Sequence, residues 1–63
     1  MTGFATTRRF RVLWRNGWQP TLVDVDDSTR RFYQGETDFE IAAALACVQK
    51  QRDRTLIRDV KEV

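Results

Sequence analysis

Residues 8–26 read Arg-Arg-Phe-Arg-Val-Leu-Trp-Arg-Asn-Gly-Trp-Gln-Pro-Thr-Leu-Val-Asp-Val-Asp, and this stretch decides the fold. Two runs rich in β-branched and aromatic residues flank the dipeptide Asn16-Gly17. Asn-Gly is the strongest short-range hairpin signal, because both central residues of a type I′ turn need positive φ. The sequence therefore predicts an antiparallel hairpin that turns at this dipeptide.

A two-residue loop at Asn16-Gly17 fixes which residues oppose each other, so that Val12 faces Thr21 and Phe10 faces Val23. Side chains alternate between the two faces of a strand, which gives the hairpin a core face and an outer face. The core face is predicted to carry Phe10, Val12, Trp14, Thr21, Val23 and Val25. The outer face is predicted to carry Arg9, Arg11, Leu13, Arg15, Trp18, Pro20, Leu22 and Asp24.

Pro20 complicates this pairing, because proline has no N–H and fits poorly inside a hydrogen-bonded ladder. A wider loop that runs to Gln19 is the alternative. Widening the loop by two residues keeps every face assignment, whereas a one-residue slip would reverse one strand. Both loop widths therefore predict the same two faces.

A turn cluster, Asp26-Asp27-Ser28-Thr29, follows the hairpin. We expect a short third strand over residues 29–34. Asp24 would then lie between Arg9 and Arg31 in a charge ladder across three strands. The same strand would place two aromatic residues beside the hairpin, Phe32 opposite Val23 on the core face and Tyr33 opposite Leu22 on the outer face.

A helix is predicted after Gly35. Thr37-Asp38-Phe39-Glu40 is a capping box, in which the threonine hydroxyl and the glutamate carboxylate each accept a backbone N–H. The segment is rich in alanine, the best helix former, so we expect one amphipathic helix over about residues 38–52. The stripe expected to lie on the hairpin is Ile41, Ala44, Leu45 and Val48. A second, smaller apolar face holds Phe39, Ala43 and Ala46.

Residues 55–63 fit two structures. They are rich in β-branched residues and alternate in polarity, which favours a final strand beside the first one. They could also continue the helix, because Leu56, Val60 and Val63 extend its stripe and neither Gly nor Pro intervenes. The strand is our prediction. Residues 1–63 are thus expected to form one small α+β domain, with an antiparallel sheet packed against one helix and a frayed lead-in over residues 1–7.

The composition excludes several classes of function. A chain of 63 residues buries only about 60% of its unfolded surface. With no histidine and a single cysteine, it can form neither an intrachain disulfide, nor a Cys-His zinc site, nor a Ser-His or Cys-His nucleophile pair. We therefore predict no catalytic, cofactor-binding or metal-binding residues and do not expect an enzyme. Oligomerisation or a bound partner remains as a source of added stability.

The formal net charge of +2 is unevenly distributed. Residues 1–23 hold four arginines and no acid, whereas residues 24–63 hold seven bases and nine acids, so a basic patch is expected on the first strand. The sequence has no secretory signal and no apolar run long enough to span a bilayer. The free Cys47 fits a reducing compartment. We expect a cytoplasmic protein without a membrane partner.

The outer face is the candidate binding surface. A contiguous exposed apolar patch on a small domain marks an interface, and Trp, Tyr and Arg are enriched at binding hot spots. A wrong register, or a C-terminal segment that covers this face, would remove the patch. We expect a protein partner or a second copy in a homodimer, and the predicted partner-binding residues are Arg9, Arg11, Leu13, Arg15, Trp18, Leu22, Arg31 and Tyr33.

The predicted function is a non-enzymatic protein–protein interaction module. We expect a small inhibitor or accessory protein that binds and blocks a protein partner through the outer face or edge of its sheet. Very small proteins without motifs are common among accessory and mobile-element products, which is an association with size alone. The alternative is a nucleic-acid-binding protein whose aromatic residues stack on bases while arginines hold phosphates. Asp24, Asp26 and Asp27 would repel such a backbone, and the strand pattern typical of RNA-binding sheets is absent.

Overall fold

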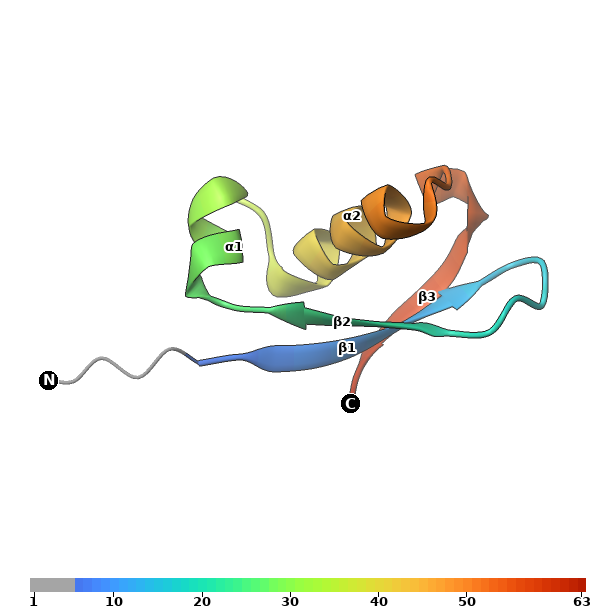
Figure 1. Ribbon diagram of the computed structural model, residues 1–63, viewed down its shortest axis with the longest axis horizontal. Coiled ribbons are helices and arrows are strands. Elements are labelled where there is room, and N and C mark those ends of the chain that lie inside the picture. Colours follow the sequence, from blue (N-terminus) through green and yellow to red (C-terminus); the bar gives the residue numbers. More distant parts are fainter. Residues whose placement is uncertain (1–5) are drawn as a thin grey trace, which may run out of the picture.

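A computed structural model describes residues 6–63, so residues 1–5 of the predicted lead-in lie outside the described residues. The strands form one antiparallel sheet in the order β2-β1-β3, and both α-helices lie over one of its faces (Figure 1). This arrangement confirms the predicted small α+β fold. The elements in chain order are β1 (Arg8–Trp14), β2 (Thr21–Val25), α1 (Asp27–Phe32), α2 (Asp38–Lys50), the short 3-10 helix η1 (Arg54–Leu56) and β3 (Ile57–Glu62).

The hairpin has the predicted register, with Phe10 paired to Val23 and Val12 paired to Thr21. All six residues of the predicted core face are buried. Thr21 is the polar member of this set, and its hydroxyl oxygen accepts the indole N–H of Trp14 over 2.9 Å. Burial of this hydroxyl is therefore compensated by a hydrogen bond.

The hairpin loop differs from the predicted type I′ turn and is the wider alternative. It spans residues 15–20, and within its Asn-Gly dipeptide only Gly17 has a positive φ, of 74°. The pairing of β1 with β2 ends at Val12 and Thr21, and the N–H of Arg15 donates to the carbonyl of Leu56 over 2.8 Å, on the β3 side of β1. As predicted for the wider loop, the faces of the paired residues are unchanged.

The third strand predicted over residues 29–34 is wrong, because Asp27–Phe32 forms α1. Asp26 caps this helix, and its Oδ1 accepts both the N–H and the hydroxyl of Thr29, over 2.9 and 2.8 Å. The acidic first residue of α1 also forms a 2.8 Å ion pair with Arg30. These local contacts satisfy the segment without any pairing to β2, whose outer edge therefore stays free among the described residues.

The helix α2 begins at the predicted capping box. The N–H of Thr37 donates to the Glu40 carboxylate over 2.8 Å, and the N–H of Glu40 donates to the Thr37 hydroxyl over 3.2 Å. The helix ends at Lys50, and Gln51 follows in the left-handed region with φ of 55°. The observed limits thus agree closely with the predicted 38–52.

The buried side of α2 is rotated from the predicted stripe. Val48 is 71% exposed, and Ala44 and Leu45 are only half-buried. The sheet supplies the large core side chains, such as Phe10 and Trp14, so the helix contributes mostly small residues and fills the remaining space. The buried residues of α2 are Ile41, Ala42, Ala43, Ala46 and Cys47. The rotation leaves Val48 at the surface and Leu45 at the border of the core.

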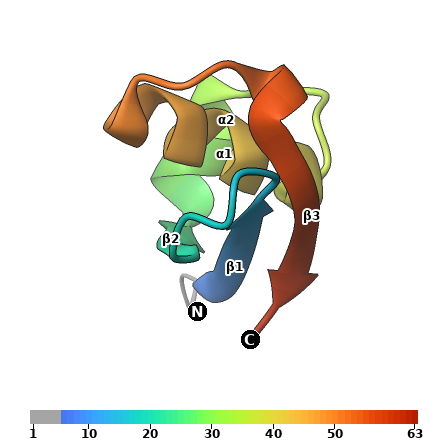
Figure 2. The same cartoon turned by 90° about the vertical axis from the view of Figure 1, so that its right-hand side faces the viewer.

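The C-terminal strand predicted over residues 55–63 forms over Ile57–Glu62, because Thr55 and Leu56 belong to η1, and the helical alternative is wrong. β3 pairs antiparallel with β1, and Val60 lies opposite Val12. Ile57 and Val60 pack against the core from this strand. Figure 2 shows the result: β1 lies between β2 and β3, and the helices cover one face only. The outer face is not covered by another element of residues 6–63.

Candidate functional site

The outer face holds only part of the predicted binding surface. Arg9, Arg11, Leu13 and Leu22 share this face, as predicted. Arg9 forms the expected pair with Asp24, with 2.9 Å between Nε and Oδ1, and this hydrogen bond lowers the pKa of the Asp24 carboxyl. Leu13 is half-buried, and Leu22 is 53% exposed. The face is therefore largely charged, with little contiguous apolar surface.

Trp18 does not lie on the outer face, which corrects the prediction. Its ring makes an edge contact with buried Trp14, with 6.2 Å between the ring centroids. The guanidinium carbon of Arg52 lies 3.8 Å from the Trp18 centroid and 4.8 Å from the Trp14 centroid. Because the loop is wider than two residues, Trp18 is outside the ladder and strand alternation does not set its direction. Its contacts are those of a residue that closes the end of the core.

Arg31 and Tyr33 are also absent from the outer face, because α1 replaces the strand that would have carried them there. Tyr33 caps the C-terminal end of α1 and packs half-buried against the core. Arg31 is exposed on α1, so the predicted ladder contains the Arg9–Asp24 pair without its third member. Arg15 lies in the hairpin loop, where its Nε donates to the Thr55 carbonyl over 3.0 Å. The predicted patch is thus dispersed.

The same dispersal removes the aromatic platform that the nucleic-acid alternative requires. Trp18 packs at the end of the core and Tyr33 lies on the helix side of the sheet. The outer face instead places Arg11 opposite Lys61 and Leu13 opposite Asp59. Base stacking needs exposed ring faces, and neither of these two aromatic residues supplies one to this surface.

The direction of each peptide group in β1 shows which peptide groups of β2 and β3 point away from the sheet. Bonded and non-bonded pairs alternate along an antiparallel ladder. Val63 donates its N–H to the carbonyl of Arg9 over 2.8 Å, so Arg9 and every second residue after it direct their peptide groups toward β3. Phe10 and Val12 consequently direct theirs toward β2.

The outer edge of β2 is open. Val23 and Thr21 pair with Phe10 and Val12, so their peptide groups point inward. The peptide groups of Leu22 and Asp24 then point away from the sheet, and no hydrogen bond from residues 6–63 reaches them. A free strand edge of this kind is a template for pairing with another chain.

The outer edge of β3 is protected by charge. The same alternation leaves the N–H of Val60 pointing outward, and the Asp59 carboxylate accepts it over 2.8 Å. Beside it, the Glu62 carboxylate accepts Nη2 and Nε of Arg8 over 2.6 and 2.9 Å. Charged side chains on an edge strand oppose the addition of another strand. The two edges therefore differ, and β2 is the edge that can accept one.

An apolar groove runs along the open edge. It lies between β2 and α2 and is lined by Leu22, Val23, Asp24, Leu45, Val48 and Gln49; we refer to it as the β2 groove. Figure 2 shows the C-terminal turn of α2 extending past the β2 side of the sheet. Three strands about 4.8 Å apart make a layer roughly 14 Å wide, and a single helix about 10 Å across does not cover it.

The apolar surface continues from the β2 groove toward α1. Leu45 also lines a second hollow together with Phe32 and Tyr33. Phe32 is 80% exposed. Leu45 packs half-buried against the core, as predicted, whereas Val48 was assigned to the core and lies at the surface. The signal was present, since the helix carries more apolar positions than one buried stripe requires.

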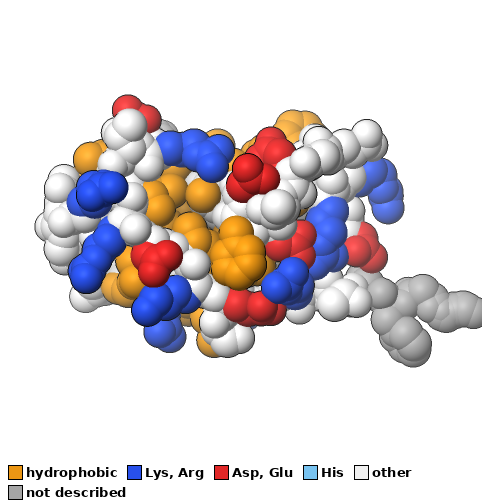
Figure 3. All heavy atoms as spheres, turned by 180° about the vertical axis from the view of Figure 1, so that it is seen from behind, with side chains coloured by type: hydrophobic (Ala, Val, Ile, Leu, Met, Phe, Trp, Pro, Cys, Tyr) orange, Lys and Arg blue, Asp and Glu red, His pale blue; other side chains and the backbone are white. Residues whose placement is uncertain are grey.

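Another apolar surface lies between α2 and β3. Figure 3 views the molecule from behind, the side of β3, and shows apolar side chains gathered near its centre among charged ones. A shallow hollow here is lined by Phe39, Glu40, Ala43, Arg54, Ile57 and Val60. The ring of Phe39 contacts the ring of Phe10 at 5.0 Å between centroids, and the adjacent β3 edge is charged. The Asp59 and Glu62 carboxylates on this edge oppose the addition of a strand.

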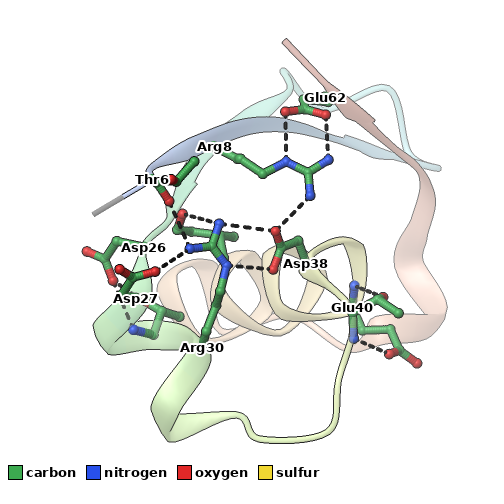
Figure 4. A network of polar contacts seen from close by, with 11 residues as sticks. Thr6, Arg8, Asp26, Asp27, Arg30, Asp38, Glu40 and Glu62 are labelled. Atoms are coloured by element: carbon green, nitrogen blue, oxygen red, sulfur yellow. Dashed lines mark hydrogen bonds and ion pairs between the residues drawn. The ribbon is translucent and has the colours of Figure 1, made fainter. Parts of the chain in front are cut away.

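A network of ion pairs joins the start of α2 to three other elements (Figure 4). Asp38, at the start of α2, accepts Nη1 of Arg8 over 2.8 Å and Nε of Arg30 over 2.9 Å. Arg8 continues to Glu62 on β3, and Arg30 reaches the carbonyl of Thr6 over 2.8 Å. The Arg30 hydrogen bond, followed by that of Arg8, lowers the pKa of the Asp38 carboxyl. The network joins β1, β3, α1 and α2.

Cys47 has no arrangement that would activate it. It is a free, buried thiol, and burial raises its pKa. Within residues 6–63, no group of three or more Cys, Asp or Glu residues is placed to hold a metal ion. The same part of the chain has no helix with the length and apolar character needed to cross a membrane.

Comparisons with protein-family models, with curated proteins and with solved structures found no match for this chain.

Proposed function

We propose that this protein is a non-enzymatic protein–protein interaction module that binds an extended segment of a partner protein along the open edge of β2. The observation that carries the proposal is the outward peptide groups of Leu22 and Asp24, which lie beside the apolar β2 groove. In strand addition, main-chain hydrogen bonds give affinity and pockets for alternate side chains give specificity.

The β2 groove sets the chemistry of the segment that would fit. Every second side chain of an added strand would point under α2 and meet Leu45 and Val48. The remaining side chains would lie beside Leu22 and Asp24 on the outer face. The expected segment alternates apolar and polar residues and has no proline where it bonds to the edge. A segment held in this way is unavailable to other proteins, so the module would act as an inhibitor or accessory protein.

Selection of peptides from a displayed random library against the immobilised protein tests the proposal. We expect the selected peptides to alternate in polarity and to bind about tenfold or more weakly to Val48→Asp, a loss equivalent to about 1.4 kcal/mol. Val63→Asp is the matched control, because Val63 follows β3 and is 65% exposed, close to the 71% of Val48. This control should bind the peptides as tightly as the unmodified protein.

Amide hydrogen exchange measured by NMR identifies the contact directly. The amides of Leu22 and Asp24 should exchange rapidly in the unbound monomer and slowly in the complex. The amides of Thr21 and Val23 point inward and should be protected in both states. Peptides that bind Val48→Asp with unchanged affinity, or that leave Leu22 and Asp24 unprotected, would contradict the proposal.

A further inference from the structure

We infer that the extended segment accepted by the β2 groove is β2 of a second copy of this chain, which gives a two-fold symmetric dimer with one continuous sheet. This inference rests on the proposed binding of a strand at the β2 edge and names the partner. It follows from the order of four residues at that edge: Pro20, Leu22, Asp24 and Asp26.

The peptide groups of two β2 strands complement each other when the two-fold axis passes beside Val23. In this register, Leu22 of each copy lies opposite Asp24 of the other copy. Residues in a bonded antiparallel pair exchange both of their N–H···O bonds. Every outward N–H and C=O of Leu22 and Asp24 is therefore paired in both copies.

The neighbouring registers are less favourable for reasons visible in the same strand. An axis at Leu22 places Pro20 opposite Asp24 of the other copy, and proline has no N–H to donate. An axis at Asp24 places two Asp24 carboxylates side by side, and like charges directly opposite destabilise a sheet. That register also uses the carbonyl of Asp26, which already accepts the N–H of Arg30 over 2.9 Å.

The charges at the β2 groove permit two copies to approach. Asp24 is its one charged lining residue, and the Arg9 of the same chain lies 2.9 Å from it. In the favoured register, Asp24 of one copy lies beside Leu22 of the other, so the two carboxylates are not directly opposed. The two copies thus meet without an unpaired like charge at the junction.

The dimer would also cover apolar surface that the single chain leaves exposed. On the helix side, Val23 would lie opposite Val23 of the other copy. The two α2 helices would lie side by side over a six-stranded sheet, and their Leu45 and Val48 side chains would meet above the junction. Closed two-fold dimers are the commonest oligomers, and a chain of 63 residues gains stability from such burial.

Sedimentation equilibrium over a wide concentration range tests the inference. We expect the mass to rise from 7.4 kDa to twice this value with increasing concentration. Val48→Asp should weaken dimerisation about tenfold or more, whereas Val63→Asp should leave it unchanged. Circular dichroism checks that both variants keep the fold. A protein that stays at 7.4 kDa at the concentrations used for NMR would overturn the inference.

Cysteine crosslinking tests the register. In a background of Cys47→Ala, Val23→Cys should oxidise to a disulfide-linked dimer, because a non-bonded antiparallel pair brings its Cα atoms to about 4.5 Å, within disulfide range. Leu22→Cys is the control, since its diagonal partner lies about 7–8 Å away. Preferential linkage through residue 22 would overturn the proposed register and with it this dimer.

The outcomes separate this inference from the proposed function. A strictly monomeric protein that still binds selected peptides, with protection of the Leu22 and Asp24 amides, would overturn the dimer and leave the strand-binding function standing. A monomer that binds no peptide through these amides would overturn both. A dimer in which these amides are protected at high concentration supports both.

Discussion

Arg30 and Asp38 join the two helices through a bidentate contact, with 2.9 Å between Nε and Oδ1 and 3.1 Å between Nη2 and Oδ2. Arg30 belongs to α1 and Asp38 begins α2. Because Phe32 and Leu45 stand on these two helices, the ion pair fixes the relation between the hollow at α1 and the β2 groove.

Replacing Asp38 should therefore loosen α1 as well as destabilise the fold. Asp38→Asn removes the charge that both Arg8 and Arg30 face, and we expect a lower melting temperature and faster amide exchange at Tyr33. Asp27→Asn is the control, because this exposed residue has one ion pair, to Arg30. Its effect should be smaller, and an equal effect of the two variants would contradict the central role of Asp38.

Stability should fall at acidic pH. Hydrogen bonds from arginine side chains or from the capped helix ends lower the pKa of five carboxyls below ordinary values of 3.8 for Asp and 4.5 for Glu. A carboxyl whose folded pKa is lowered stabilises the fold fully above its unfolded pKa and loses this contribution as the pH falls through the folded value. The five are Asp24, Asp26, Asp38, Glu40 and Glu62.

Urea unfolding across the acidic range measures this dependence. The free energy of unfolding should decrease as the pH drops below the ordinary carboxyl values, and Asp38→Asn should make the decrease shallower. Between about pH 5 and 8, where an unperturbed histidine would titrate, the free energy should be nearly constant, because the chain has no histidine. A free energy that does not change on acidification would contradict these carboxyl contributions.

The rotated face of α2 predicts opposite responses at two positions. Ala46 is fully buried against the sheet, so Ala46→Leu should overpack the core and cost about 1–3 kcal/mol. Val48 is 71% exposed, so Val48→Leu should change the free energy of unfolding by less than about 0.5 kcal/mol. Chemical unfolding of both variants measures the difference. The reverse order would favour the stripe expected from the sequence.

Trp18 should behave as a structural residue. Its edge contact with Trp14 is of a kind that contributes about 0.5–1.5 kcal/mol, and Arg52 adds a cation–π contact at 3.8 Å. Trp18→Ala should therefore lower the free energy of unfolding by roughly 1–2 kcal/mol. Trp18→Phe is the control, because it keeps an aromatic ring and should lose less. Unchanged stability in Trp18→Ala would return this residue to the candidate binding surface.

The elements that sequence reasoning located correctly are those with strong local signals. The Asn16-Gly17 signal located the hairpin, and its register was correct although the loop is wider than two residues, because widening by two residues keeps every face whereas a one-residue slip would reverse one strand. The capping box at Thr37 and Glu40 fixed the start of α2. The β-branched residues of 55–63 and their alternation with polar ones predicted the C-terminal strand, which forms over Ile57–Glu62.

The errors arose where local capping or packing decided between close alternatives. Asp26 caps a short helix that the sequence also allowed to be a strand, and alanine-rich α2 offered several apolar faces of similar strength. The candidate site depended on both choices. Tyr33 does not lie on the outer face, and Val48 does not lie in the core. The apolar surface is therefore at the edge of β2 and not on the face of the sheet.

Cys47 should serve as a reporter of opening beneath α2. Its side chain packs in the core from the buried face of α2, and burial raises the pKa of the thiol. Only the thiolate attacks a disulfide reagent, so the folded protein should react far more slowly than the urea-unfolded chain. Ala46→Leu, which disturbs the packing next to Cys47, should speed the reaction in the folded protein, whereas Val63→Asp should not. Reaction at the unfolded rate in the folded protein would show that this thiol is accessible and that the packing of α2 against the sheet does not bury it.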